Sequence, residues 1–247
     1  MERIRAWIAA APDYPAADGD RREIELFGLR LPVRVTVALT VVTFALLFDH
    51  SRTFLPDDIV ALGRAPEAMR VTAVERLVLF ALVPLVVIAL GFRDRISRYG
   101  LALGDWRAGL ALVLAGCVVM TPIVVWNGTL PGVQAYYAVS DEPLPSLLLT
   151  NTIDLAASEF LFRGFVMFTL VRAIGPVGVL VATLPFVFAH LGKPELELFS
   201  TLGGGLIYGW LAWRTGSIVW GTIGHIYILT LAIVLAGAAT GGVAPGV

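Results

Sequence analysis

Residues 147–171 read LLLTNTIDLAASEFLFRGFVMFTLV, and this stretch decides the fold class. An α-helix of about 20 mainly apolar residues crosses the hydrocarbon core of a bilayer, and this run is long enough. It nevertheless contains Asp154, Glu159 and Arg163. A charge at mid-bilayer costs at least about 2.5–3.5 kcal/mol on insertion scales, so such groups usually pair within a bundle and mark a working site. We therefore expect a membrane helix that carries buried polar chemistry.

The composition excludes a soluble globular domain. Hydrophobic residues make up 57% of the chain and charged residues 15%, with a mean hydropathy of +0.82. A soluble protein has nearer ~25% charged residues. The net charge of −1 gives no reason to expect a nucleic-acid partner. The single Cys117 cannot form an intramolecular disulfide, and the chain has no CxxC-type metal spacing. We expect an integral membrane protein surrounded by lipid.

Hydropathy predicts an all-α, polytopic bundle of about seven transmembrane helices. Short connections late in the chain make the last four helices antiparallel neighbours. Gly205 and Gly209 have the small-xxx-small spacing that lets two helix backbones approach closely, so we expect them to pack within the bundle. The expected spans are residues 31–48, 77–92, 108–126, 147–171, 174–191, 198–213 and 217–236.

The chain divides into a peripheral segment, residues 1–30, and a membrane domain, residues 31–247. Apolar and charged side chains near the N-terminus lie at helical spacing, which predicts a short helix on the membrane surface. Orientation follows the Lys and Arg residues of the loops. With the N-terminus in the cytoplasm, the inner segments carry 12 of them and the outer segments five. An N-in, C-out topology is favoured.

Polar residues of three spans converge at one depth. Glu159 and Arg163 are four residues apart, so they share a helix face. An intrahelical salt bridge explains this pair equally well when the helix is considered alone. His190 ends the fifth span, where an interfacial histidine is the commoner interpretation, whereas His225 lies about eight residues inside the seventh. At 1.5 Å per residue, Glu159 and His225 have similar depths, and His190 lies ~9 Å closer to the side where the fourth span begins. All three could line one cavity.

Three motifs on successive spans carry a family resemblance. They read Ser158-Glu159-Phe-Leu-Phe-Arg163 followed by Gly164-Phe165, Phe186-xxx-His190, and His225-xxx-Leu229. Their order and spacing, together with the Gly-rich stretch 203–216 between the last two, resemble the CPBP family. These are the membrane-embedded CAAX proteases and bacteriocin-processing proteins, also called the Abi domain, with motifs E-E-x-x-x-R, F-x-x-x-H and H-x-x-x-N. The resemblance covers about residues 147–236.

This resemblance implies an intramembrane endopeptidase of the CAAX prenyl protease type. In the family, a first-motif glutamate and the second-motif histidine activate a water, and the third-motif histidine and asparagine stabilise the oxyanion. Glu159, His190 and His225 carry over as catalytic residues, with Arg163 orienting the glutamate. The implied substrate or partner is a membrane-associated peptide or protein. The implied location is the cytoplasmic membrane of a prokaryote.

Two positions depart from the motifs. Ser158 stands where the catalytic glutamate is expected, and a serine hydroxyl is far too weak a base for this step. Leu229 replaces the asparagine, and losing one oxyanion donor typically lowers the rate about 10²–10³-fold. Glu159 is one candidate replacement base. Asp154, one turn before Ser158 on the same face, is another.

Three other hypotheses remain besides an active protease. A catalytically inactive relative could keep the scaffold as a partner-binding, immunity or regulatory protein. Glu159, His190 and His225 would also make a His₂Glu zinc set, although the chain has no HExxH helix. A transporter fits least, because the polar residues cluster and trace no path across the bilayer. We expect no bound cofactor and keep zinc as the lesser alternative.

Overall fold

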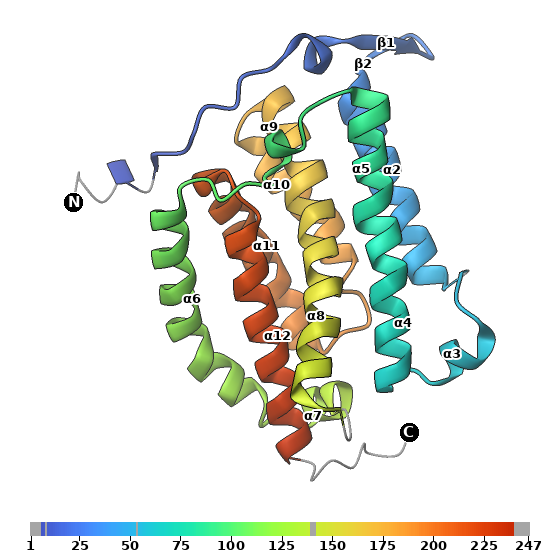
Figure 1. The fold of residues 1–247 in the computed structure, drawn as a ribbon, viewed down its shortest axis with the longest axis vertical. Coiled ribbons are helices and arrows are strands. Elements are labelled where there is room, and N and C mark those ends of the chain that lie inside the picture. The colour runs from blue at the N-terminus through green and yellow to red at the C-terminus, as the bar shows by residue number, and fades with distance from the viewer. Residues whose placement is uncertain (1–5, 8, 53, 139–141, 240–247) are drawn as a thin grey trace.

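Long helices stand side by side in this computed structural model and account for most of the chain (Figure 1). The structure describes residues 6–7, 9–52, 54–138 and 142–239. A two-stranded hairpin near the N-terminus accompanies the helices. The predicted all-α membrane bundle is confirmed.

Two long helices contain π-helical segments but continue in one direction. Residues 66–92 and residues 144–174 each form one long rod in this way. The elements in chain order are η1 (Asp18–Arg21), β1 (Glu23–Leu26), β2 (Leu29–Pro32), α2 (Val33–Ser51), α3 (Asp57–Ala61), α4 (Pro66–Arg76), η2 (Leu77–Leu82), α5 (Val83–Val86), η3 (Val87–Phe92), η4 (Ile96–Tyr99), α6 (Trp106–Asn127), α7 (Pro131–Tyr137), α8 (Leu144–Glu159), η5 (Phe160–Met167), α9 (Phe168–Ile174), α10 (Val177–Phe188), α11 (Glu195–Thr215) and α12 (Val219–Ala239).

Four helices of the described chain are long and apolar enough to cross a membrane: Val33–Ser51, Pro66–Phe92, Trp106–Asn127 and Val219–Ala238. The apolar helix α10 is shorter, at 12 residues. The second span begins at Pro66, 11 residues before the predicted start at residue 77. The predicted span began too late because it left the charged Glu75 and Arg76 in the preceding loop. The structure keeps Arg76 in the helix by pairing it with Asp49 and Asp154.

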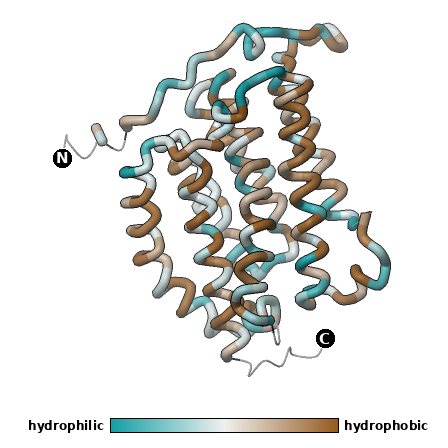
Figure 2. The backbone as a smooth tube through the Cα atoms, in the orientation of Figure 1, coloured by the Kyte–Doolittle hydropathy of each residue, from teal (hydrophilic) through white to brown (hydrophobic). Residues whose placement is uncertain are grey.

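The rod α8–η5–α9 is the centre of the bundle. Every side chain from residue 157 to residue 172 is buried, whereas α2, α5 and α6 expose many large apolar side chains. Figure 2 shows this apolar character along the outer helices. Since a helix buried on all sides needs neighbours on all sides, the surrounding helices shield this rod from lipid. The polar residues of α8 and η5 therefore lie in a protected interior.

Close packing of α10 against α11 depends on two glycines. A Cβ atom at Gly205 would lie 2.6 Å from Cγ2 of Thr183, and one at Gly209 would lie 2.8 Å from Cγ1 of Val179. Both distances are too short for real carbon contacts. The predicted packing role of this glycine pair within the bundle is confirmed.

The N-terminal segment crosses the end of the bundle and enters a hairpin (Figure 1). The surface helix was predicted mainly from residues 1–5 and Ile8, which lie outside the described residues. Strands β1 and β2 pair in antiparallel register, with Glu23 opposite Pro32 and Leu26 opposite Leu29. The hairpin was not predicted. Strand β2 passes directly into α2, so the hairpin sits where the first span enters the bilayer.

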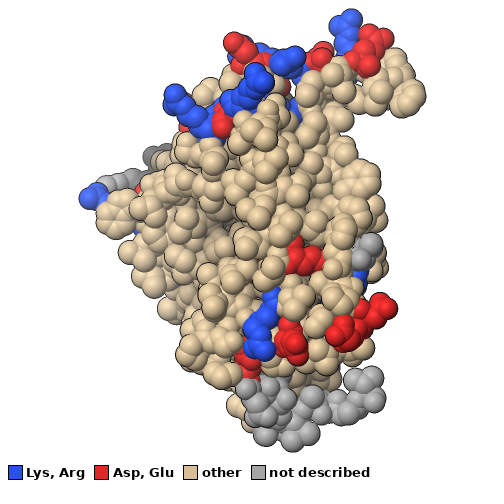
Figure 3. Space-filling model, turned by 45° about the vertical axis from the view of Figure 1, so that its right-hand side comes forward, with Lys and Arg blue, Asp and Glu red and all other residues tan. Residues whose placement is uncertain are grey.

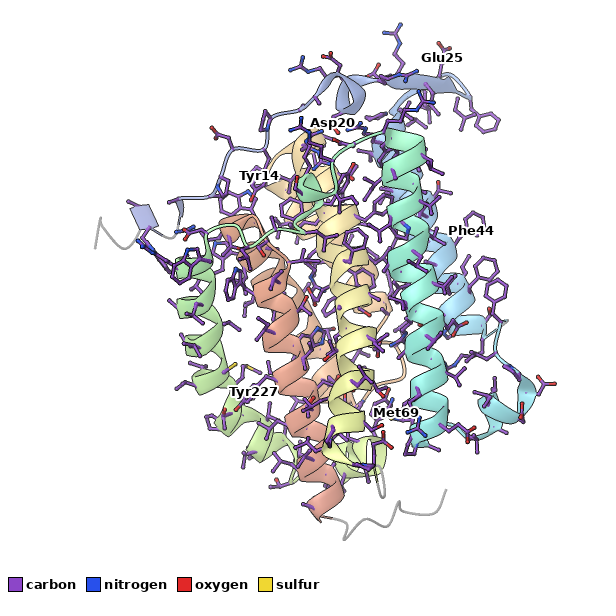
Figure 4. The ribbon with its side chains drawn as sticks, viewed as in Figure 1. Tyr14, Asp20, Glu25, Phe44, Met69 and Tyr227 are labelled. Carbon is purple, nitrogen blue, oxygen red and sulfur yellow. The ribbon has the colours of Figure 1, made fainter. Side chains whose placement is uncertain are left out.

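Asp20 fastens this segment to three parts of the bundle. Its carboxylate accepts hydrogen bonds from Arg34 of α2 at 2.8 Å, Arg98 of η4 at 3.0 Å and Arg172 of α9 at 3.3 Å. Burial raises the pKa of Asp20, but the hydrogen bonds from Arg34 and its other partners outweigh it and lower the pKa to about 2. Figure 4 shows Asp20 beside the helix ends. We refer to this side of the molecule as the hairpin end.

Candidate functional site

Glu159 is the most deeply buried charged residue of the motifs, with 0% of its surface exposed. Its Oε1 atom accepts a hydrogen bond from Nη1 of Arg163 at 3.1 Å and contacts Nδ1 of His225 at 2.9 Å. Its Oε2 atom is buried and has no hydrogen-bond partner among the described residues. One oxygen thus joins an arginine one turn away to a histidine on another helix.

Arg163 completes this buried pair from the π-helical segment η5. Its guanidinium carbon lies 3.8 Å from the ring centroid of Phe186, a cation–π distance. The ring of Tyr208 lies 5.7 Å away on another side. Its Nη2 atom has no hydrogen-bond partner within the described chain. Aromatic faces therefore take over part of the solvation that water would give this charge.

His225 is held between a carboxylate and an aromatic ring. Its imidazole stacks on Tyr208 of α11, with 5.3 Å between ring centroids and 18° between planes. Because a carboxylate is an acceptor, Nδ1 carries the proton in this contact. Nε2 makes no hydrogen bond to a described residue and remains available to a ligand. The predicted convergence of Glu159 and His225 is seen directly.

His190 lies nearby but does not hydrogen-bond to either of those residues. Its Nδ1 atom lies 2.8 Å from the backbone oxygen of Phe186, and its ring packs on Phe186 with 4.4 Å between centroids. The carbonyl accepts, so Nδ1 donates and Nε2 carries the lone pair. Phe186 also approaches His225, at 6.2 Å. The second-motif phenylalanine thus stands between the two imidazoles.

Ser158, at the first-motif position where a glutamate is expected, lies beside a second ionic cluster. Ser158 Oγ lies 3.5 Å from Oδ1 of Asp154, one turn earlier. Both carboxylate oxygens of Asp154 accept from Nη1 of Arg76 at 3.1 Å, and Arg76 also binds Asp49 of α2. Sequence reasoning missed Arg76 and Asp49 because it placed Arg76 in a loop. The signal available was a basic residue directly before an apolar run.

A cavity of about 700 Å³ lies beside this second cluster. Asn151, Asp154 and Leu229 line it, whereas Glu159, His190 and His225 do not. Its remaining wall combines apolar side chains of α2, α10 and α12 with basic residues at the end away from the hairpin. Leu229 therefore faces this space at the position where the motif has an asparagine. The cavity meets the site on the side of α8 that carries Asp154.

A polar cluster closes the far end of the cavity. Tyr137 donates to Glu197 at 2.6 Å, and Lys193 binds the same carboxylate at 2.7 Å. Burial lowers the pKa of Lys193, but Tyr137 and Glu197 outweigh it and raise that pKa above its usual range. Lys193 thus stays charged at the cavity wall.

The zinc alternative needs three ligands around one point. Among the described residues, no group of three or more His, Cys, Asp or Glu side chains is close enough together to hold a metal ion. Glu159 and His225 touch, and the contacts of His190 run instead to Phe186.

The comparison with protein families identifies the part of the chain that carries this site. Residues 140–231 match the family described as type II CAAX prenyl endopeptidase Rce1-like. The core of this chain is Rce1-like. This confirms the CPBP resemblance. No curated protein and no solved structure matches the chain.

The Rce1-like core contains all three motifs and the helices that hold them. It includes α8, η5, α9, α10 and α11 and ends within α12. Helices α2, α4 and α6, which enclose it, lie outside the matched residues. Tyr208, which the sequence reasoning missed, belongs to the core and contacts both Arg163 and His225. A tyrosine within the Gly-rich helix, between two motifs, was the signal that could have indicated it.

Proposed function

We propose that this protein uses its Rce1-like core to bind a membrane-associated peptide or protein segment without hydrolysing it. It would act in the cytoplasmic membrane of a prokaryote as a partner-binding, immunity or regulatory protein. The cavity beside α8 is the proposed binding place, and its apolar and basic lining suits a segment that arrives from the bilayer. The match of residues 140–231 to the Rce1-like family supports the class of ligand.

The observation that carries this proposal is the environment of Glu159. A general base must lie within hydrogen-bond reach of the water it deprotonates. Glu159 is fully buried, binds Arg163 and His225, and does not line the cavity. Its contacts suit a structural role that joins η5 to α12. Ser158, at the expected position of the base, contributes a hydroxyl instead.

The oxyanion side of the reaction is equally incomplete. His225 keeps one free ring nitrogen, but Leu229 offers an apolar side chain where a hydrogen-bond donor is required. Removing one such donor typically lowers a rate about 10²–10³-fold, and loss of the base lowers it further. Together the two changes support binding over turnover.

An endopeptidase is the second candidate, and Asp154 favours it. This carboxylate lines the cavity, and its side chain is 21% exposed. It lies one turn before Ser158, in the direction toward which helical side chains lean. In this alternative Asp154 and His190 activate the water, Glu159 and Arg163 hold the site together, and His225 stabilises the oxyanion.

One experiment separates the two candidates. The purified protein, reconstituted in lipid nanodiscs, is mixed with a farnesylated CAAX peptide that carries a fluorophore. Anisotropy measures binding, and mass spectrometry measures cleavage. We expect binding without cleavage by the natural chain. We expect the double substitution Ser158→Glu with Leu229→Asn to produce cleavage, because it restores both missing groups.

Variants of the cavity test the binding place. Leu46→Trp fills the cavity and should weaken peptide binding by about tenfold, or ~1.4 kcal/mol. Leu114→Trp is the matched control, because Leu114 is 57% exposed on α6 and does not line the cavity. Equal binding by both variants would overturn the proposed place. Cleavage by the natural chain that disappears in Asp154→Asn would establish the second candidate instead.

A further inference from the structure

The hairpin at the N-terminus has one apolar face and one polar face. Successive residues of a strand point to opposite faces, and residues paired across an antiparallel ladder point to the same face. In this register Ile24 is opposite Leu31, and Leu26 is opposite Leu29. Glu25 is opposite Arg30 on the other face. The apolar face therefore consists of Ile24, Leu26, Leu29 and Leu31.

Much of this apolar face is uncovered by protein. Ile24 is 42% exposed, Leu26 44% and Leu29 61%, and Phe27 at the tip is 95% exposed. Phe27 also has a positive φ of 53°, which turns the chain before Gly28. An isolated two-stranded hairpin is at best marginally stable in water, so such a face needs a partner.

The hairpin is held at both ends, which fixes the direction of its faces. Just before it, Asp20 binds arginines of α2, η4 and α9. Just after it, β2 passes into α2, and the amide of Val33 donates to the backbone oxygen of Arg22 at 2.9 Å. Figure 4 shows Glu25 pointing away from the helices. The opposite, apolar face is thus turned toward the side where the bilayer surrounds the bundle.

We propose that this hairpin is an interfacial membrane anchor, whose apolar face and Phe27 tip enter the leaflet next to the start of α2. The occupant of the face is lipid, because β2 continues directly into α2, where Phe44 is also exposed and does not line the cavity. Phe and Leu are among the side chains that interfacial amphipathic helices bury at this depth of a membrane.

Basic side chains beside the apolar face suit the same occupant. Arg21, Arg22 and Arg30 flank or belong to the hairpin, alongside Glu23 and Glu25, and among the described residues none of the three arginines forms a salt bridge. Long basic side chains can place their heads among lipid phosphates while their stems cover apolar surface. Figure 3 shows charged side chains gathered at this end of the molecule and an uncharged tip beside them.

Adjacent residues on opposite faces provide the test. Spin labels are attached to Leu29→Cys and, separately, to Arg30→Cys, each in a Cys117→Ser chain, in nanodiscs of mixed neutral and anionic lipid. Oxygen concentrates in the bilayer and a nickel chelate in water. We expect the ratio of oxygen to nickel collision rates to be severalfold higher for the label at position 29 than for the label at position 30.

Phe27→Asp, added to the protein labelled at position 29, should lower the oxygen-to-nickel ratio to the value measured at position 30. The thermal unfolding midpoint of this Phe27→Asp variant should stay unchanged. Equal ratios at the two positions before this change would overturn the proposal, since both faces would then be in water. Protection of position 29 from both reagents, with broadening by a second label, would also overturn it and indicate a second copy of the chain on the face.

Discussion

Oε1 of Glu159 lies 2.9 Å from Nδ1 of His225, although 66 residues separate the two in the chain. The same oxygen accepts from Arg163 at 3.1 Å. One atom therefore links α8, η5 and α12 inside the bundle. In a chain that lacks the first-motif base, this link gives the carboxylate, the guanidinium and the imidazole a common structural contact.

Glu159→Gln should destabilise the protein by about 3–5 kcal/mol, because the change leaves the Arg163 charge buried without its counter-charge. Unfolding by SDS in mixed micelles measures the effect. Arg70→Gln is the control, since the Arg70 side chain is 49% exposed in its pair with Glu142 and surface pairs contribute about 0–1 kcal/mol. Adding Arg163→Met to Glu159→Gln should recover much of the loss. Equal losses for the Glu159→Gln and Arg70→Gln variants would contradict a stabilising role for Glu159.

Gly205→Ala should destabilise the bundle by about 1–3 kcal/mol, because its new methyl group would lie 2.6 Å from Thr183. Gly204→Ala, one residue earlier in the same helix, meets no atom within 4 Å and should stabilise α11 by about 0.5–1 kcal/mol. Thermal unfolding of the two variants in one detergent compares them directly. An equal loss of stability in both variants would show that glycine is required for the backbone conformation of α11 and not for its contact with α10.

Particular residues show how far the sequence alone could lead. Continuous apolar runs located the spans, and the convergence of Glu159 with His225 followed from depth, because helix rise is constant. Depth could not predict that Phe186 separates His190 from His225, since rotation of each helix about its axis depends on packing. Arg76 was misplaced for a related reason. Its partners Asp49 and Asp154 lie on other helices, and a pattern along the chain does not reveal them.

Asp20 makes the free energy of unfolding of the protein depend on pH. Its folded pKa of about 2 is below the ordinary value of 3.8, so its contribution is complete above that ordinary value and disappears as the pH falls toward 2. A shift of this size corresponds to about 2 kcal/mol at neutral pH. We expect Asp20→Asn to lose this amount at pH 7 and to flatten the dependence between pH 5 and pH 2, about the range of its titration. The exposed Asp18→Asn should change neither property, as denaturation across that pH range will show.

The hairpin end should face the cytoplasm, as the predicted excess of 12 basic residues over five indicates. In a Cys117→Ser chain, a membrane-impermeant maleimide added to intact cells should label Glu67→Cys at the far end of α4. The same reagent should label Glu25→Cys in the hairpin only after the cells are lysed. Since Lys193 and the adjoining loops bound the cavity at the far end, this result would mean that a peptide enters from outside the cytoplasm. Labelling of Glu25→Cys in intact cells would show the opposite topology, with the far end of the cavity on the cytoplasmic side.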